Sequence, residues 1–254
     1  MTGHAHAEPS WTGPHPVHGT SRTRLQHWLC DANNKCVPAE GGDFTENMNW
    51  RIFRIMAEFV EGFEFLSKLT KEVSIFGSTR VSSGNRYFQM AKELGKICGS
   101  AGYTVITGGG PGIMEAGNWG AHSAGGTSVG LDISLPAEQR RNQYVNKSMG
   151  FHYFFTRKVM LSASSQAYVF FPGGFGTFDE LFEIVTLIQT GKMSDQVPVI
   201  LVGRAYWEPL LEWIYSTMCE ENRFINKDEF KILRLVDSPK EAFEIIKKTH
   251  ERLL

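Results

Sequence analysis

The chain has 254 residues, 42% of them hydrophobic, and a formal net charge of −1 from 26 basic and 27 acidic side chains. A chain of this length can bury one large core, and α/β domains of this size are often single. The balanced charge provides no overall field to attract nucleic acid or a membrane surface, so we expect neither as a partner. No apolar run approaches the roughly 20 residues that span a bilayer, and the N-terminus lacks a secretion-signal pattern.

The cysteine content favours a reducing compartment. Four cysteines are too few and too scattered for a disulfide framework in a chain of this length. They are Cys30, Cys36, Cys98 and Cys219. We therefore expect a cytoplasmic protein.

Residues 1–42 differ in composition from the rest. They contain five of the eight histidines, four of the ten prolines and few aliphatic residues. Such a segment buries too little apolar surface to order itself, which predicts a flexible tail. A metal site using these histidines with Cys30 and Cys36 is the alternative, but the cysteine spacing is poor for zinc and no second pair exists. We expect no metal site, and we assign residues 43–254 to one domain.

A helix is predicted over 46–69, where large apolar residues recur every three or four positions. They are Trp50, Phe53, Met56, Phe59, Phe63, Leu66 and Leu69. One aromatic-rich face of this helix should therefore be buried, either in the core or against another subunit.

Strands and helices then alternate along the chain. Strands are predicted at 73–76, 103–106, 128–133, 167–171, 197–202 and 230–236. Helices are predicted at 87–100, 113–123, 156–164, from Thr177 onward, at 207–219 and from Ser238. A polar crossover from Pro136 to Asn142 follows the third strand. This alternation implies a parallel sheet covered on both faces, with ligands beyond the carboxyl ends of the strands. The turns after Phe76, Ile106 and Phe171 should converge there.

The turn at 172–177 has the pattern of a phosphate site. Gly173, Gly174 and Gly176 lie between an apolar strand and a helix, so backbone N–H groups and the positive end of the helix dipole point to one place. Glu180 lies one turn inside that helix and is a candidate for the same site. In a second interpretation Thr177 and Glu180 form a capping box, and Glu180 only stabilises the helix.

Two common nucleotide motifs are excluded. The G-x-G-x-x-G pattern fails because Ile113 and Glu115 occupy the positions that its third glycine requires, and no G-x-x-x-x-G-K-[ST] is present. A second glycine turn remains at 107–112, with Glu115 in the first turn of the next helix. Glu115 is either a site residue or an ordinary acid favoured near a helix N-terminus.

The segment PGGFGTFDE, from Pro172 to Glu180, matches the PGGxGTxxE signature of the LOG family. GSTR after the first strand, TGGGPGIMEA, LPAEQ and FHYFFTRKVM agree with it in order across about 73–213. With its N-terminal helix and long crossover, the chain resembles the longer LOG subgroup. The family's second motif, MxxRK, reads FFTRK here, with Phe154 in place of methionine.

This resemblance implies a Rossmann-like α/β fold, a doubly wound parallel sheet with helices on both faces and an extra N-terminal helix. It implies hydrolysis of the N-glycosidic bond of a nucleoside 5′-monophosphate, such as AMP or an N6-substituted AMP, to free base and ribose 5-phosphate. It implies no cofactor, and a homodimer or higher homo-oligomer.

The resemblance also implies roles for individual residues. Glu180 and Arg157 are the expected catalytic residues. A carboxylate can stabilise the positive charge that develops on ribose as the C1′–N bond breaks. The expected substrate and phosphate ligands are Gly77, Ser78, Arg80, Gly109, Gly110, Glu115, Lys158, Gly173, Gly174, Gly176 and Thr177. From sequence alone, Arg157 and Lys158 could instead belong to a solvated basic face.

Two other function classes remain open. The same scaffold can bind nucleotides without turnover, as a sensor or a molybdenum-cofactor carrier does, and such a protein needs the glycines but not Glu180. A pyridoxal-phosphate decarboxylase is a weaker alternative, because no lysine lies on a strand-end loop with a matching acidic partner.

Overall fold

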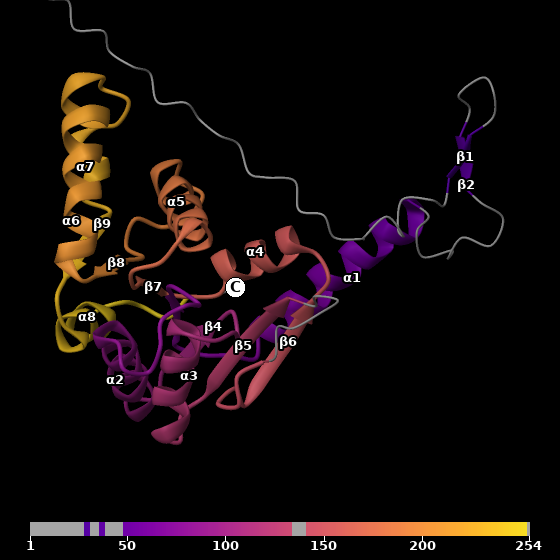
Figure 1. Cartoon of the computed structure of the whole chain (residues 1–254), viewed down its shortest axis with the longest axis horizontal. Coiled ribbons are helices and arrows are strands. Elements are labelled where there is room, and N and C mark those ends of the chain that lie inside the picture. The colour runs from indigo at the N-terminus through magenta and orange to yellow at the C-terminus, as the bar shows by residue number, and fades with distance from the viewer. Residues whose placement is uncertain (1–27, 31–35, 39–47, 134–140, 253–254) are drawn as a thin grey trace, which may run out of the picture. The chain divides into compact units, whose positions relative to one another are not determined.

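The computed structural model describes residues 28–30, 36–38, 48–133 and 141–252 (Figure 1). The chain divides into two units, Met1–Arg51 and Ile52–Leu254. In the first unit, β1 (Trp28–Cys30) and β2 (Cys36–Pro38) form an antiparallel pair in which Cys30 is opposite Cys36. The five histidines of residues 1–42 and most of the predicted crossover lie outside the described residues.

The second unit contains a seven-stranded parallel sheet. Its strands are β3 (Glu72–Phe76), β4 (Thr104–Thr107), β5 (Ser128–Ile133), β6 (Lys147–Phe151), β7 (Ala167–Phe170), β8 (Val199–Val202) and β9 (Leu233–Val236). The order is β6-β5-β4-β3-β7-β8-β9, and every neighbouring pair is parallel. The chain thus builds outward from β3 to β6, returns, and builds outward again from β7. The predicted doubly wound sheet is confirmed, with its switch point between β3 and β7.

Helices cover both faces of the sheet. They are α1 (Met48–Leu66), α2 (Arg86–Ser100), α3 (Ile113–Ser123), α4 (Phe154–Ala163), α5 (Phe175–Gln189), α6 (Arg204–Trp213), α7 (Lys227–Phe230) and α8 (Pro239–Ile246), and α6 continues as a π-helix, η2 (Ile214–Glu221). In Figure 1, α2, α3 and α8 lie on one side of the sheet and α4, α5 and α6 on the other. None of the helices in the described ranges is long and apolar enough to cross a membrane.

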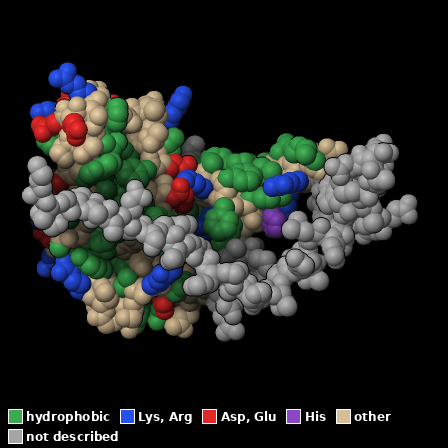
Figure 2. All heavy atoms as spheres, turned by 45° about the horizontal axis from the view of Figure 1, so that its top comes forward, with side chains coloured by type: hydrophobic (Ala, Val, Ile, Leu, Met, Phe, Trp, Pro, Cys, Tyr) green, Lys and Arg blue, Asp and Glu red, His purple; other side chains and the backbone are tan. Residues whose placement is uncertain are grey.

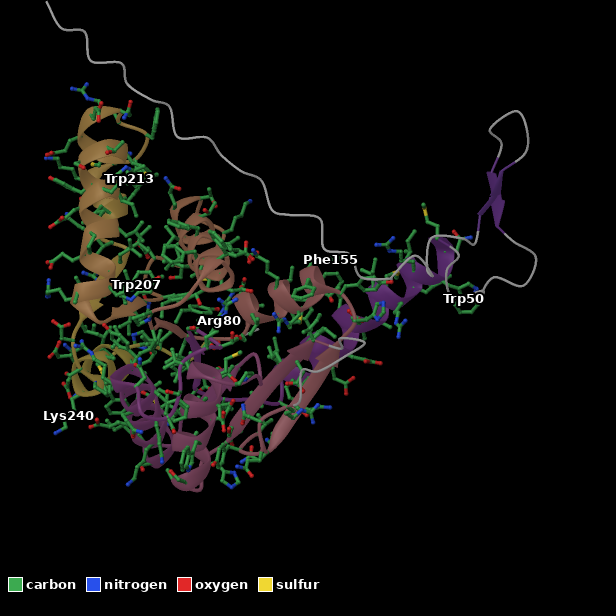
Figure 3. The ribbon with its side chains drawn as sticks, viewed as in Figure 1. Trp50, Arg80, Phe155, Trp207, Trp213 and Lys240 are labelled. Atoms are coloured by element: carbon green, nitrogen blue, oxygen red, sulfur yellow. The ribbon has the colours of Figure 1, made fainter. Side chains whose placement is uncertain are left out.

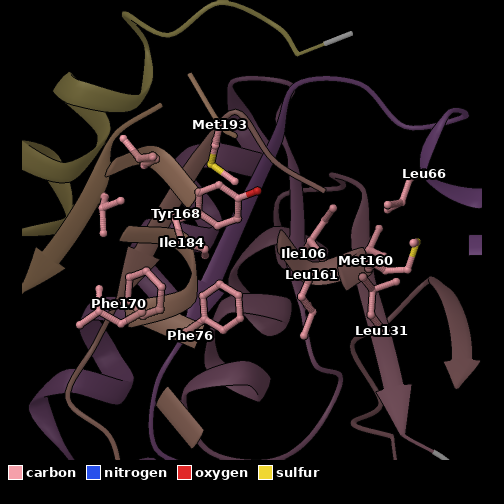
Figure 4. Packing of buried hydrophobic residues seen from close by; sticks show 14 of the residues in the cluster. Leu66, Phe76, Ile106, Leu131, Met160, Leu161, Tyr168, Phe170, Ile184 and Met193 are labelled. Atoms are coloured by element: carbon pink, nitrogen blue, oxygen red, sulfur yellow. The ribbon is translucent and has the colours of Figure 1, made fainter. Parts of the chain in front are cut away.

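The core has two halves because side chains alternate along each strand. Phe76, Ile106 and Leu131 point to the half shared with α4 and α5, which also contains Met160 and Ile184 (Figure 4). Neighbouring strand residues point to the other half, beneath α2, α3 and α8. The sheet is therefore anchored on both faces, and its strand ends are held in fixed relative positions.

Several element bounds differ from the sequence prediction, and two differences bear on the site region. Strand β6 was not predicted, because its sequence, KSMGF, has neither branched residues nor an alternating pattern. Helix α4 begins at Phe154, two residues earlier than expected. The last helix begins as predicted, with the Ser238 hydroxyl accepting a hydrogen bond from the Glu241 amide at 3.2 Å.

The apolar face of α1 is only partly buried. Leu66 is 1% exposed and packs in the core. Phe53, Met56 and Phe63 are 61%, 55% and 43% exposed. Of the two predicted alternatives, packing of the whole face in the core of this chain is wrong, and its burial against another subunit stays a prediction. Figure 2 shows further hydrophobic side chains at the surface, among charged ones.

Candidate active site

Three loops meet at the carboxyl edge of the sheet. The Ser78 amide, after β3, donates a hydrogen bond to the Pro172 carbonyl, after β7, at 3.0 Å. The Ser78 carbonyl accepts one from the Ile113 amide, at the start of α3, also at 3.0 Å. The predicted convergence of the strand-end turns is therefore confirmed, and the predicted Gly77 and Ser78 lie at its centre.

Close approach of these loops requires glycine at two positions. A Cβ at Gly77 would lie 2.7 Å from the Ile113 side chain, and one at Gly112 would lie 2.3 Å from the Ser78 carbonyl oxygen. Gly112 also has a φ of +71°, which other residues rarely adopt. Gly112 was not among the predicted site residues. Its role is to let the glycine turn after β4 contact the loop after β3.

The bend before α5 is a helix N-terminus without a side-chain cap. Gly174 is the N-cap, and the helix begins at Phe175. Thr177 lies inside the first turn, where its amide bonds to the Gly174 carbonyl at 3.0 Å. A capping box formed by Thr177 and Glu180 is therefore excluded. The earliest amides of the helix precede its internal hydrogen bonds, as at any helix start, and are available to an anion.

The three glycines of this bend differ in the space around them. A Cβ at Gly173 would lie 2.0 Å from the Thr177 hydroxyl oxygen, so the chain itself requires glycine there. A Cβ at Gly174 or Gly176 would meet no described atom within 4 Å. These two positions lie beside open space at the mouth of the bend, where a ligand can approach the backbone.

Glu180 is directed into the protein from α5. It is 8% exposed, and its Oε2 atom has no hydrogen-bond partner among the described residues. Burial raises the pKa of Glu180 to about 7, and the Glu183 carboxylate adds to the rise, while Lys158 and Arg157 oppose it. A carboxylate that changes charge near neutral pH and lacks a partner is typical of a catalytic group.

Arg157 reaches the same region from α4. Its Nη1 atom would lie 3.4 Å from a Cβ placed on Gly108, so the guanidinium adjoins the turn after β4. Its Nε atom is buried without a hydrogen-bond partner among the described residues. Burial lowers the pKa of Arg157, whereas Glu180 and Asp132 raise it. Arg157 is therefore not part of a solvated basic face, and it lies within the electrostatic influence of two carboxylates.

Lys158 is turned toward α5. Its ammonium pairs with Asp179 at 2.6 Å and Glu183 at 3.4 Å. It also lines an open groove of about 510 Å³ along α5, with Phe178, Phe182 and other α5 side chains. None of the predicted glycines lines this groove, so it is separate from the glycine bend. The expected contact of Lys158 with substrate competes with its two carboxylate partners.

The turn after β4 is held by polar residues that were not predicted as site residues. The Asn142 amide group donates hydrogen bonds to the carbonyls of Gly109 (3.1 Å) and Gly110 (3.0 Å), and to the Asn118 side chain (3.0 Å). Thr107 also donates to Asn118, at 2.6 Å. These bonds fix the conformation of the predicted Gly109 and Gly110. Asn142 lies in the predicted crossover, but sequence could not show which loop it contacts.

Asp132, at the end of β5, is a carboxylate that the sequence analysis missed. It pairs with Arg141, and its Oδ1 atom has no hydrogen-bond partner among the described residues. A Cβ at Gly109, whose φ is +72°, would lie 1.9 Å from this atom. Burial raises the pKa of Asp132, and Arg141 and Arg157 oppose the rise. Its place at a strand end was the sequence signal that could have identified it.

The remaining predicted ligands are at the margins of this region. Arg80 is exposed after Ser78, and its amide bonds to the Ser78 hydroxyl at 3.1 Å (Figure 3). Glu115 is partly buried in the first turn of α3. Among the described residues no group of three or more His, Cys, Asp or Glu side chains could hold a metal ion.

The burial of Glu180 predicts a pH-dependent stability. Its pKa is about 7 in the folded protein against an ordinary 4.5, so the folded state binds the proton more tightly. The free energy of unfolding should therefore fall as the pH rises from about 4.5 to 7. Glu180→Gln should remove up to about 3 kcal/mol of that fall. Urea unfolding at pH 5 and pH 8 measures it, with Glu212→Gln on the surface of α6 as control. Parallel pH dependences of wild type and Glu180→Gln would contradict the buried, uncompensated carboxylate.

Comparisons with known proteins show which chains this one is similar to. Residues 114–246 match a protein family described as "possible lysine decarboxylase". Over 189 residues the chain is 26% identical to a protein from Oryza sativa subsp. japonica named "probable cytokinin riboside 5′-monophosphate phosphoribohydrolase LOGL2", covering 72% of this chain and 76% of that protein. It is also 26% identical over 153 residues to the cytokinin riboside 5′-monophosphate phosphoribohydrolase of Rhodococcoides fascians, covering 59% and 77%.

Solved structures share the fold. The molybdenum cofactor carrier protein of Chlamydomonas reinhardtii superposes with a TM-score of 0.53 at 22% identity, covering 70% of this chain and 96% of that one. The molybdenum cofactor binding protein of Rippkaea orientalis gives 0.51 at 22% identity, covering 69% and 93%. With more than half of its length matched by the family that the glycine motif indicated, the chain belongs to the LOG family, described as possible lysine decarboxylases.

Proposed function

We propose that this protein hydrolyses the N-glycosidic bond of a nucleoside 5′-monophosphate, AMP or an N6-substituted AMP, releasing free base and ribose 5-phosphate. The observation that most supports this proposal is the pairing of a buried, unpartnered carboxylate, Glu180, with an uncapped helix N-terminus six residues earlier. One feature suits a sugar cation and the other suits a phosphate. The names of the curated relatives describe the same class of reaction.

The 5′-phosphate would bind at the bend before α5. Gly174 and Gly176 leave the backbone open there, and the helix dipole favours negative charge. Ser78 and Arg80 lie on the adjoining loop, which is hydrogen-bonded to the bend through Pro172. With the phosphate bound there, the ribose would lie beside Glu180 and the base would point away from the bend.

Glu180 would act on the anomeric carbon. When the C1′–N bond breaks, its electron pair leaves with the base and positive charge develops on the ribose ring. The ionised carboxylate stabilises that charge and accepts a proton from the attacking water, whose oxygen bonds to C1′. The departing base takes up a proton, so the reaction adds one water. A pKa near 7 suits a group that must first be ionised and then accept a proton.

Arg157 would stabilise the negative charge that develops on the departing base. Its guanidinium adjoins Gly108, and its partly buried position strengthens its field at the site. The Asp132 carboxylate, next to the same turn, interacts electrostatically with Arg157 and favours its charged form. A binding protein without turnover would need the glycine bend but would gain nothing from the cost of burying Glu180 without a partner.

We also propose that the protein works as at least a dimer in the cytoplasm. Phe154, Phe155 and Phe182 on α4 and α5 are 60%, 46% and 40% exposed, in addition to the exposed face of α1 (Figure 3). Apolar surface of this extent favours a subunit interface. Light scattering of the full chain should give at least twice the chain mass of 28.6 kDa. A monomeric mass at micromolar concentration would refute the dimer.

Substitution of the two catalytic residues tests the reaction. We expect Glu180→Gln and Arg157→Ala each to lower kcat for adenine release from AMP by at least about 100-fold, because each removes charge stabilisation in the transition state. The rate is measured by chromatography of the free base released from each of four substrates: AMP, GMP, CMP and isopentenyladenosine monophosphate. The surface variant Glu212→Gln is the control and should match wild type. Near wild-type release of every base by either variant would show that the assignment is wrong. Tight AMP binding by the wild type without turnover would indicate a carrier or sensor instead.

Gly176→Ala tests the phosphate site with opposite effects on stability and binding. Alanine is favoured over glycine in a helix by up to about 1 kcal/mol in the interior, and Gly176 lies in the first turn, where the gain is smaller; the added methyl meets no described atom, so stability should rise slightly. The methyl would lie where the phosphate approaches the backbone, so the Kd for AMP should increase by roughly 10-fold or more. Calorimetry should show little change for adenosine, which lacks the phosphate. Equal weakening of AMP and adenosine would place the phosphate elsewhere.

A further inference from the structure

Glu58 is a buried carboxylate that belongs to none of the loops described above. It lies on α1 and is 7% exposed. Its Oε1 accepts a hydrogen bond from the His152 amide at 2.7 Å. Its Oε2 accepts from the Tyr153 amide at 3.4 Å and from the Thr156 hydroxyl at 2.5 Å. All three donors come from one short segment almost a hundred residues later in the chain.

That segment is the N-terminus of α4. Tyr153 is the N-cap of this helix, and its own side chain makes no capping hydrogen bond. The first four amides of a helix, from the N-cap onward, need acceptors, and the helix dipole favours negative charge at this end. Glu58 thus caps α4 from α1 by accepting the N-cap amide of Tyr153, and it also accepts the preceding amide of His152.

A second contact, one turn further along both helices, holds the same pair together. A Cβ at Gly62 would lie 2.5 Å from the Met160 sulfur, so α1 and α4 approach closely at that point. Gly62 follows Glu58 by four residues, and Met160 follows Thr156 by four, which places each pair on one face of its helix. The polar contact and the packing contact together restrain sliding and rotation of α4.

Arg157 follows Thr156 directly on α4. A rotation or shift of this helix would move the guanidinium relative to Glu180, which is held on a different helix. We propose that Glu58 is a positioning residue for Arg157: by capping α4 and holding Thr156, it sets the place of the guanidinium in the site. This inference rests on the function proposed above for Arg157.

The inference predicts a loss specific to the chemical step. Misplacement of a charged group by about 1 Å can cost on the order of 100-fold in rate. Glu58→Ala should therefore lower kcat for AMP by roughly 10- to 100-fold and change KM less. Glu58→Gln should recover part of this loss: its amide oxygen still accepts from His152, and its NH₂ group can donate to the Thr156 hydroxyl, which then donates to the Tyr153 carbonyl at 2.8 Å, whereas the Tyr153 amide loses its acceptor. Thr156→Val, which removes only the hydroxyl, should lower kcat in the same direction.

A stability control separates positioning from general weakening of the fold. Leu66→Ala lies on the same helix, and its side chain is 1% exposed in the core, so it should lower Tm without lowering kcat at a temperature where the protein is folded. The double variant Glu58→Ala with Arg157→Ala should be no slower than Arg157→Ala alone, because Glu58 acts through Arg157. The proposal would be overturned if the losses of kcat in the two single variants multiplied in the double variant. It would also be overturned if the kcat of Glu58→Ala were within twofold of wild type.

Hydrogen exchange gives a readout that does not need turnover. In Glu58→Ala the amides of residues 152–156 should exchange faster than in wild type. In Leu66→Ala, compared under native conditions, the exchange of these amides should not increase more than that of other amides. If the wild type releases no base from any nucleotide, the proposed function fails whatever this exchange pattern is. If the wild type is active and Glu58→Ala leaves exchange at α4 unaltered, the positioning role alone is refuted.

Discussion

The hydrogen bond between the Ser78 amide and the Pro172 carbonyl joins the two halves of the doubly wound sheet at their switch point. One half of the sheet grows from β3 and the other from β7; these two strands pair directly, and the Ser78–Pro172 bond continues their contact into the strand-end loops. Because Ser78 also accepts from the Ile113 amide, a single residue connects the loops that open α3 and α5. Two helix N-termini are thereby directed toward one region, which is the electrostatic basis of an anion site.

Around that region the protein leaves polar atoms without partners. Asp132 Oδ1, Arg157 Nε and Glu180 Oε2 are all buried and lack hydrogen bonds among the described residues. Each such atom costs free energy, on the order of 1–3 kcal/mol. These are three of the six such atoms among the described residues, and three together are expected of a site whose ligand supplies the missing partners. The same burial brings the pKa of Glu180 close to neutrality.

The two catalytic candidates lie on separate helices, and each is positioned differently. Glu180 follows the glycine bend on α5, so its position depends on the strand-end loops. Arg157 lies on α4, which has no cap of its own and depends on Glu58 from α1. Helix α1, which has an exposed apolar face, therefore contacts the helix that carries Arg157.

Sequence alone predicted the architecture, which the structure confirms, and it indicated the region proposed as the site. Alternating strand and helix patterns predicted the parallel sheet, and short glycine turns at strand ends predicted where loops converge, because both follow from local periodicity and backbone chemistry. The orientation of Glu180 could not be decided this way, since a capping box and an inward-facing acid have the same spacing. Burial decided it. The contributions of Asp132, Asn142 and Glu58 likewise depend on contacts between segments distant in the chain, which only the tertiary structure brings together.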